Sequence, residues 1–243
     1  MTGRIKSQKV LMRICAINQL TDYVFQILLC SADEEPLIFY AGQYLMLHYS
    51  DKCDACAYSI ASSPVPATNY IELHIECRPD SKTATEVMQH LKQHSHVEIT
   101  FPEGNCFLNE QNIPATPLIF IAASTGFAQM KSMIEFIKTT DHAYPKWLYW
   151  GVKHHSDFYI TDLPILWEKE GLIYHPVVSN KNNQWKGRFG LLYEALLEDD
   201  CPDFHNAHIY IGGSSQMVNA SADQFIAAGF SASKMHSDAL LPP

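Results

Sequence analysis

The chain has no long hydrophobic run. No segment of its 243 residues approaches the roughly 18 consecutive apolar residues that a bilayer-spanning helix needs. The first nine residues are basic, but they lack the apolar core of a secretory signal. These two absences lead us to expect a cytoplasmic protein with no membrane span.

Basic residues are also scarce. Lys and Arg number 17 against 26 Asp and Glu, so the formal net charge is −9. Nucleic acids and anionic membranes are bound by clustered Lys and Arg, and this balance argues against either as a partner. Any polyanionic cofactor must therefore be held by local groups.

A cysteine framework is missing as well. The seven cysteines are odd in number and widely scattered, which predicts reduced thiols rather than disulfides. Cys53 and Cys56 form a Cys-x-x-Cys pair, for which half a zinc site and a redox pair are the alternatives. No second such pair exists, and the strand–helix context of a redox motif is absent. His90 and His94 have the spacing of a helical zinc pair but no glutamate between them, and we predict no metal site.

The chain is long enough for two domains of about 100–150 residues. Its first hundred residues carry short apolar or alternating segments separated by turn residues, and one segment with helical spacing at Thr83–Gln93. The predicted strands are Val10–Ile17, Tyr23–Leu29, Gln43–Tyr49, Tyr58–Ala61, Ile71–Glu76 and Val97–Phe101. This pattern favours a small all-β antiparallel barrel plugged by one helix.

The second half alternates strands with helices. It opens with the continuous apolar run Pro117–Ala122, typical of a buried parallel strand, and a helix is predicted over Phe127–Thr139. The later predicted elements, strand and helix in turn, are Trp147–Gly151, Leu163–Glu170, Leu172–Val178, Leu191–Leu197, His208–Ile211 and Ser215–Ala228. This rhythm predicts an α/β doubly wound parallel sheet of the Rossmann-like type. We place the domains at 1–110 and 111–243.

Three short motifs carry chemical information. Ala41-Gly-Gln-Tyr-Leu45 precedes Ala57-Tyr-Ser-Ile-Ala-Ser-Ser-Pro64, and Ile121-Ala-Ala-Ser-Thr-Gly-Phe127 follows far downstream. Together they resemble the flavin-binding and nicotinamide-binding signatures of the ferredoxin–NADP reductase superfamily. The resemblance runs from about Val10 to Leu240 and is closest to small bacterial NAD(P)H:flavin oxidoreductases. It implies a Greek-key barrel that binds FAD or FMN, followed by a domain that binds NADH or NADPH.

The resemblance assigns residues to the flavin. Tyr58 lies against the isoalloxazine or its ribityl chain, and the Ser59 hydroxyl reaches N5 as the catalytic contact. The strand around His74 offers its backbone edge to the ring, and the turn near Thr83 faces the phosphate. His74 alone has the simpler interpretation of a packed strand residue. The full predicted flavin set is Cys56, Ala57, Tyr58, Ser59, His74, Ile75, Glu76 and Thr83.

A second set is assigned to the nicotinamide nucleotide. The turn at Ala123–Gly126 follows a strand and opens a helix, where backbone N–H groups can meet a pyrophosphate. Ala123 and Ser124 stand where the family usually has glycines. The full predicted set is Ala123, Ser124, Thr125, Gly126, Gly151, Gly212, Gly213, Ser214 and Met217.

Cys56 occupies the position of the arginine that holds the flavin phosphate in the family. A neutral thiol cannot make that charge-assisted contact, which is worth roughly 1.5–3 kcal/mol. Lys52, Arg78 and Lys82 are the candidates to replace it. We therefore expect a flavin reductase whose flavin is an exchangeable substrate. The alternatives are a flavin- or nucleotide-binding module with eroded signatures, and a reductase subunit that serves a dedicated electron-accepting protein such as an oxygenase.

Overall fold

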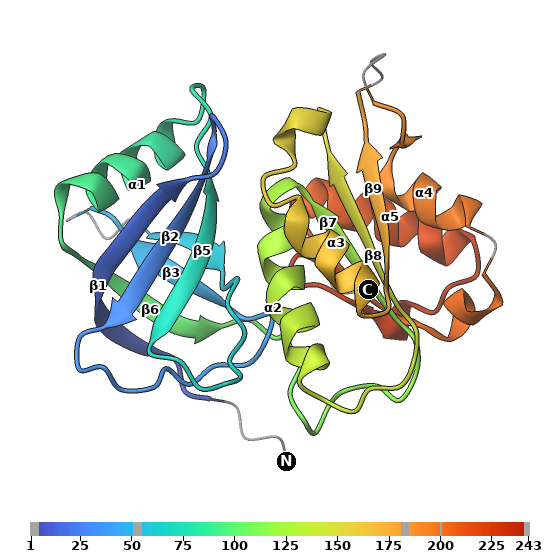
Figure 1. Ribbon diagram of the computed structural model, residues 1–243, viewed down its shortest axis with the longest axis horizontal. Coiled ribbons are helices and arrows are strands. Elements are labelled where there is room, and N and C mark those ends of the chain that lie inside the picture. Colours follow the sequence, from blue (N-terminus) through green and yellow to red (C-terminus); the bar gives the residue numbers. More distant parts are fainter. Residues whose placement is uncertain (1–4, 51–54, 181–184, 200, 241–243) are drawn as a thin grey trace. The chain divides into compact units, whose positions relative to one another are not determined.

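The computed structural model describes residues 5–50, 55–180, 185–199 and 201–240 (Figure 1). They fall into two compact units. The first runs to Asn112 and also includes Lys131–Asp141; the second holds Ile113–Met130 and the chain from His142 onward. Each unit is described by itself below.

The first unit is a six-stranded antiparallel sheet that nearly closes into a barrel. Its strands are β1 (Gln8–Gln19), β2 (Val24–Ser31), β3 (Tyr44–His48), β4 (Ala55–Ser59), β5 (Tyr70–Glu76) and β6 (His96–Glu103). They are ordered β4-β3-β6-β1-β2-β5, and a bridge between Ile60 and Leu73 joins the two edges. The predicted antiparallel barrel is confirmed.

Alternation along the strands builds the barrel core. In β2 the burial of Ile27 and Leu29 alternates with half-exposed neighbours, and β3 buries Leu45 and Leu47 in the same way. Helix α1 (Lys82–Gln93) adds Val87, Met88 and Leu91 to this cluster. The predicted helix therefore exists, and its apolar face completes the core.

Two expectations in this unit are wrong. Strand β4 begins at Ala55 and ends at Ser59, so it includes Cys56, which the sequence placed before the strand. Cys15 and Cys30 form a disulfide, contrary to the expectation of reduced thiols throughout. The cause is tertiary: β1 pairs with β2, and the ladder shifts register between Ile14 and Ala16, which brings Cys15 beside Cys30.

The second unit contains a six-stranded sheet ordered β10-β9-β8-β7-β11-β12, in which every pairing is parallel. The strands are β7 (Leu118–Ala123), β8 (Lys146–Val152), β9 (Leu172–Val178), β10 (Arg188–Phe189), β11 (His208–Gly212) and β12 (Met235–His236). The helices are α2 (Phe127–Lys138), whose residues from Lys131 onward belong to the first unit, α3 (Asp162–Lys169), α4 (Leu192–Glu198) and α5 (Ser215–Ala227). Short 3₁₀ turns lie at Ser124–Gly126, His155–Asp157, Pro202–Asn206 and Ala232–Lys234.

Side-chain alternation in this sheet feeds two layers. Ile119 and Ile121 of β7 pack in one cluster with α4 and α5 residues such as Leu196 and Phe225. On the opposite face Trp150 of β8 stacks on Phe127, with ring centroids 4.0 Å apart. Figure 1 shows α3 and α5 on opposite faces of the sheet. The predicted doubly wound α/β fold is confirmed, whereas the two-residue strands β10 and β12 were not foreseen.

Candidate active site

The two flavin-type motifs meet in the β3–β4 ladder. Tyr44 lies opposite Ser59, and Leu45 lies opposite Tyr58. The N–H of Ile60 donates to the carbonyl of Gln43 at 3.0 Å, which extends the pairing past the end of both strands. Segments fourteen residues apart in sequence therefore form one continuous backbone surface.

Cys56 and Tyr58 share one face of β4 because successive side chains alternate. Both pack against the barrel core, while Ala57 between them is exposed. Burial, followed by the neighbouring thiols of Cys56 and Cys77, raises the pKa of Tyr58 well above its ordinary value. The Tyr58 hydroxyl therefore stays protonated and remains a hydrogen-bond donor.

The His74 side chain is fully buried. Its Nε2 lies 2.8 Å from Glu72 Oε1, and burial lowers the pKa of the ring. The backbone of β5 is oriented differently: the carbonyl of Glu72 accepts from Ala61, and its N–H donates to Ser62 Oγ, both on the side away from β2. Alternation turns the backbone groups of His74 and Glu76 to that same side. Any ligand contact from His74 is therefore through its main chain.

The first turn of α1 lies beside the Tyr58 cluster. Cys77, a neighbour of Tyr58, has its Sγ 3.9 Å from Thr85 Oγ1. Ser81 caps the helix by accepting from the Ala84 N–H at 3.4 Å, and Thr83 is exposed in this turn. The first turn of a helix favours an anionic group in general.

The three basic residues that are candidates to replace the family arginine differ in their surroundings. Arg78 donates from Nε to Glu76 Oε1 at 2.5 Å, so its charge is shared with a carboxylate. Lys82 is 89% exposed at the start of α1. Lys52 and Cys53 lie outside the described residues, so only Cys56 of the predicted Cys-x-x-Cys pair lies within them.

In the second unit the turn after β7 takes an unusual backbone. Ser124 has a φ of +48°, a left-handed conformation that glycine adopts more readily. The indole Nε1 of Trp150 donates to the Ser124 carbonyl at 3.0 Å and fixes the turn. Gly126, at the end of the turn, contacts the backbone of Gly212. The β7–α2 turn and the β11–α5 turn are therefore packed directly together.

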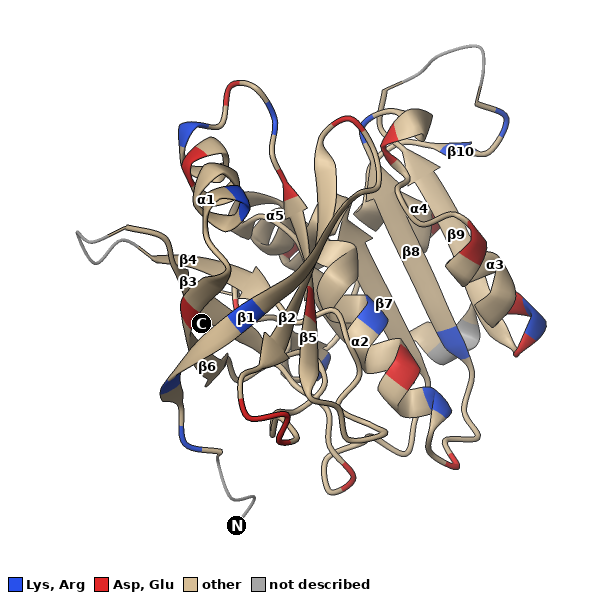
Figure 2. Cartoon of the chain, turned by 60° about the vertical axis from the view of Figure 1, so that its left-hand side comes forward, with Lys and Arg blue, Asp and Glu red and all other residues tan. Residues whose placement is uncertain are grey.

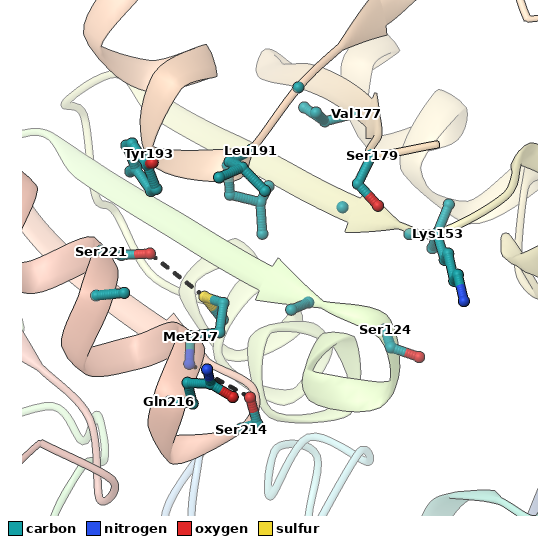
Figure 3. A pocket seen from close by; sticks show the side chains of 16 residues that line it. Ser124, Lys153, Val177, Ser179, Leu191, Tyr193, Ser214, Gln216, Met217 and Ser221 are labelled. Carbon is teal, nitrogen blue, oxygen red and sulfur yellow. Dashed lines mark hydrogen bonds between the residues drawn. The ribbon is translucent and has the colours of Figure 1, made fainter. Parts of the chain in front are cut away.

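A cavity of about 390 Å³ opens at the carboxyl ends of these strands (Figure 3). Five predicted nucleotide residues line it, namely Ala123, Ser124, Gly151, Ser214 and Met217, while Thr125, Gly126, Gly212 and Gly213 are not in its wall. Ser214 accepts from the Met217 N–H at 3.3 Å and caps α5, as Figure 3 shows. Among the described residues that line the cavity, Lys153 is the one with a charged side chain.

Sequence reasoning missed several residues of this wall. Val177 lies in β9 and Ser179 directly after it. Leu191 and Tyr193 lie at the start of α4, and Gln216 lies in α5. For Val177 and Ser179 the position at a strand end was a usable signal, because ligands of doubly wound sheets bind at that edge.

Within residues 5–50, 55–180, 185–199 and 201–240 no group of three or more His, Cys, Asp and Glu is placed to hold a metal ion. His90 and His94 stack at 4.2 Å, and His94 Nδ1 donates to the His90 carbonyl. The same described ranges contain no helix long and apolar enough to cross a membrane.

Known proteins share both the sequence and the fold. The oxidoreductase NAD-binding domain family matches residues 120–223. The chain is 32% identical over 219 residues to the NAD(P)H-flavin reductase of Vibrio harveyi, a match that covers 88% of this chain and 90% of that protein. It is 35% identical over 204 residues to Protein RfbI of Salmonella typhimurium, covering 83% of this chain but only 59% of the length of RfbI.

A solved structure supports the fold independently. The ferredoxin reductase in carbazole 1,9a-dioxygenase superposes with a TM-score of 0.84 at 20% identity, over 98% of this chain and 71% of that one. The barrel, the parallel sheet and the curated relatives agree with the predicted resemblance. The chain belongs to the ferredoxin–NADP reductase superfamily.

Proposed function

We propose that the chain is an NAD(P)H:flavin oxidoreductase that takes its flavin as an exchangeable substrate. The observation that carries most of this proposal is the cavity at the carboxyl ends of the parallel strands, walled by Ala123, Ser124 and Met217. The likeness to a flavin reductase over nine tenths of its length supports the same activity.

The residues present fit a dinucleotide. Gly126 and Gly212 have no side chains where the two turns meet, and a Cβ on either would overlap the backbone of the other. The absence of side chains lets backbone N–H groups of the turns approach a ligand closely. The predicted set Ala123, Ser124, Thr125, Gly126, Gly151, Gly212, Gly213, Ser214 and Met217 is our nucleotide site, with residues 111–243 as its domain.

The flavin site is proposed on the barrel, within residues 1–110. Tyr58 supplies a half-buried aromatic ring with a protonated hydroxyl, and Ser59 supplies the hydrogen bond to N5. Ala57, His74 and Glu76 contribute backbone contacts, Ile75 lies between the last two, and Thr83 lies at the phosphate end. When both are bound, the nicotinamide would supply the hydride and the flavin would accept it, so the chain needs no dedicated acid or base.

Loose flavin binding follows from the charge at the phosphate end. Cys56 is neutral as a thiol and its side chain lies with Tyr58 against the core, while Arg78 is paired with Glu76. Riboflavin, which has no phosphate, should therefore serve nearly as well as FMN or FAD. The reduced flavin then passes to another acceptor, for which we propose a cytoplasmic oxidant or an electron-accepting protein.

Steady-state oxidation of NADH and NADPH tests the proposal, with riboflavin, FMN and FAD each present or absent. The proposal expects turnover only when flavin is added, and a colourless protein after purification. A folded protein that binds flavin without turnover identifies a binding module. Turnover that needs a second protein identifies a reductase subunit.

A further inference from the structure

Lys131 is a buried cation in contact with the segment that follows Tyr58 and Ser59. Its Nζ donates to the Ala61 carbonyl at 3.2 Å, to Glu72 Oε2 at 2.9 Å and to Glu135 Oε2 at 3.1 Å. The Lys131 side chain is 9% exposed. All of these groups belong to the first unit, and Figure 2 shows the alternating basic and acidic positions along α2.

The partner carboxylate is equally well held. Glu72 Oε1 accepts from Gln26 Nε2 at 2.7 Å and lies 2.8 Å from His74 Nε2. Burial would raise the pKa of Glu72, but the His74 hydrogen bond and the Lys131 charge outweigh it and hold the pKa well below its ordinary value. Burial opposes the charge on Lys131 too, yet Glu72 and Glu135 raise its pKa. The pair stays ionised under ordinary conditions.

The next residue of α2 holds the next residue of the segment. Ser132 Oγ donates to the Ser62 carbonyl at 2.7 Å and accepts from the Gly42 N–H at 3.4 Å. Lys131 and Ser132 thus hold two consecutive carbonyls, those of Ala61 and Ser62. The Gly42 contact lies in the Ala41–Leu45 motif, which pairs with Tyr58 and Ser59.

Ala61 is consequently fixed on both sides. Its N–H donates to the Glu72 carbonyl at 2.8 Å, and its own carbonyl accepts from Lys131. Ser59 lies two residues earlier on the same chain, so its direction depends on where Ala61 is held. We propose that Lys131 is a positioning residue for flavin, acting through the Ala61 carbonyl and Glu72 to aim Ser59.

This inference rests on the proposed flavin site, and it predicts a selective effect. Lys131→Met should raise the KM for flavin about tenfold, the fold-change that follows from a weakened hydrogen bond to the ring. The KM for NAD(P)H should stay within about twofold of wild type, because flavin alone depends on Ser59. Lys131→Arg should restore most of the flavin KM. Lys138→Met on the same helix is the matched control and should behave as wild type.

Removing Lys131 leaves the buried Glu72 carboxylate without its cation, which destabilises the fold. A second variant therefore separates the loss of stability from the loss of Ser59 positioning. Lys131→Met/Glu72→Gln removes both charges and should recover thermal stability, while the Ala61 carbonyl still lacks its cation. We expect this double variant to keep the raised flavin KM and to bind riboflavin about tenfold more weakly in a fluorescence titration.

Wild-type turnover tests the proposed function, and the ratio of variant to wild-type riboflavin affinity tests the positioning role, even if turnover is absent. A folded double variant that binds riboflavin as wild type does would overturn the role of Lys131. Equal rises in the KM values for flavin and NAD(P)H would also overturn it.

Discussion

Gly126 and Gly212 lie backbone to backbone, although 86 positions separate them in the chain. A Cβ on Gly212 would lie 2.7 Å from the Gly126 carbonyl oxygen, and a Cβ on Gly126 would overlap the Gly212 carbonyl. Real side chains do not approach so closely, so each turn depends on the absence of a side chain in the other.

Gly126→Ala should therefore force the two turns apart. We expect at least a tenfold rise in the KM for NAD(P)H, because the N–H groups of both turns move off the nucleotide. The KM for flavin should change little. Gly171→Ala is the control: its φ of +94° makes alanine unfavourable, but nothing lies within 4 Å of the added Cβ. An unchanged NAD(P)H KM in a folded Gly126→Ala would contradict the packing of this site.

Ser124 carries backbone strain that glycine would relieve. A left-handed backbone destabilises a non-glycine residue by about 1–3 kcal/mol, and glycine relieves this strain. Glycine also gives the unfolded chain more conformational entropy, which offsets roughly 0.4–1 kcal/mol of the gain. With φ at +48°, Ser124→Gly should raise the free energy of unfolding by about 1 kcal/mol, measured by urea titration. Ser124→Ala keeps the strain and should give no gain. A less stable Ser124→Gly would show that the serine side chain contributes more than the strain costs.

Cys56→Arg restores the charge that the phosphate end lacks. The side chain would leave β4 on the same face as Tyr58. We expect affinity for FMN and FAD to rise about ten- to a hundredfold, the range of one charge-assisted contact. Riboflavin affinity should stay within about twofold, because riboflavin has no phosphate.

Flavin fluorescence titrations of all three ligands measure these affinities. Cys56→Ser is the matched neutral control. If Cys56→Arg leaves FMN and FAD binding unchanged, the phosphate does not lie near residue 56.

Ser59→Ala should slow hydride transfer while leaving nucleotide binding intact. Loss of one neutral hydrogen bond to N5 corresponds to about a tenfold lower kcat. Ser63→Ala is the control, since the Ser63 hydroxyl bonds within its own loop, to the Val65 carbonyl. Stopped-flow reduction of flavin measures the step. A kcat equal to that of wild type would remove Ser59 from the reacting group.

His236 should make the second unit sensitive to acid. Its Nε2 lies 2.8 Å from His208 Nδ1, and burial followed by the charge of His208 lowers the pKa of His236 to about 4. The unfolded histidine titrates near about 6.5. Between these values the unfolded chain binds a proton that the folded chain does not, so stability falls as pH drops from about 6.5 to 4.

His236 is partly exposed, so solvent screens its charge, and we expect the pH-dependent loss of stability to be about 1–2 kcal/mol. Urea unfolding of wild type and His236→Gln across this range measures it. The variant should lose less stability than wild type on acidification. Parallel pH profiles for the two proteins would refute this role of His236.

The sequence predicted the parts of the fold that depend on local pattern. Continuous apolar residues at Pro117–Ala122 indicated the buried strand β7, and alternation indicated the barrel strands. Strand β4 was placed too late because Ala55 and Cys56 have little of the β-branched or aromatic character that marks strands. The motif pairs Tyr44–Leu45 and Tyr58–Ser59 were named from sequence, and the register shows why they belong together.

Other features depend on residues distant in sequence, so no local pattern announces them. Lys131 contacts Glu72 across 59 positions, and the Cys15–Cys30 disulfide needs a register shift in β1. Ser124 has a left-handed backbone conformation, which serine rarely adopts. The Trp150 indole that holds this turn lies 26 residues away. The wall residues Leu191 and Tyr193 lie just after β10, a two-residue strand at the sheet edge that no local pattern predicted.

The most direct test of the central claim is anaerobic reduction of free riboflavin by NADH and NADPH with a catalytic amount of the purified chain. We predict that many equivalents of riboflavin are bleached per molecule of protein, with at least one of the two nucleotides, and that FMN and FAD are reduced with similar efficiency. If neither nucleotide bleaches any of the three flavins while the protein is folded, the chain is not an NAD(P)H:flavin oxidoreductase.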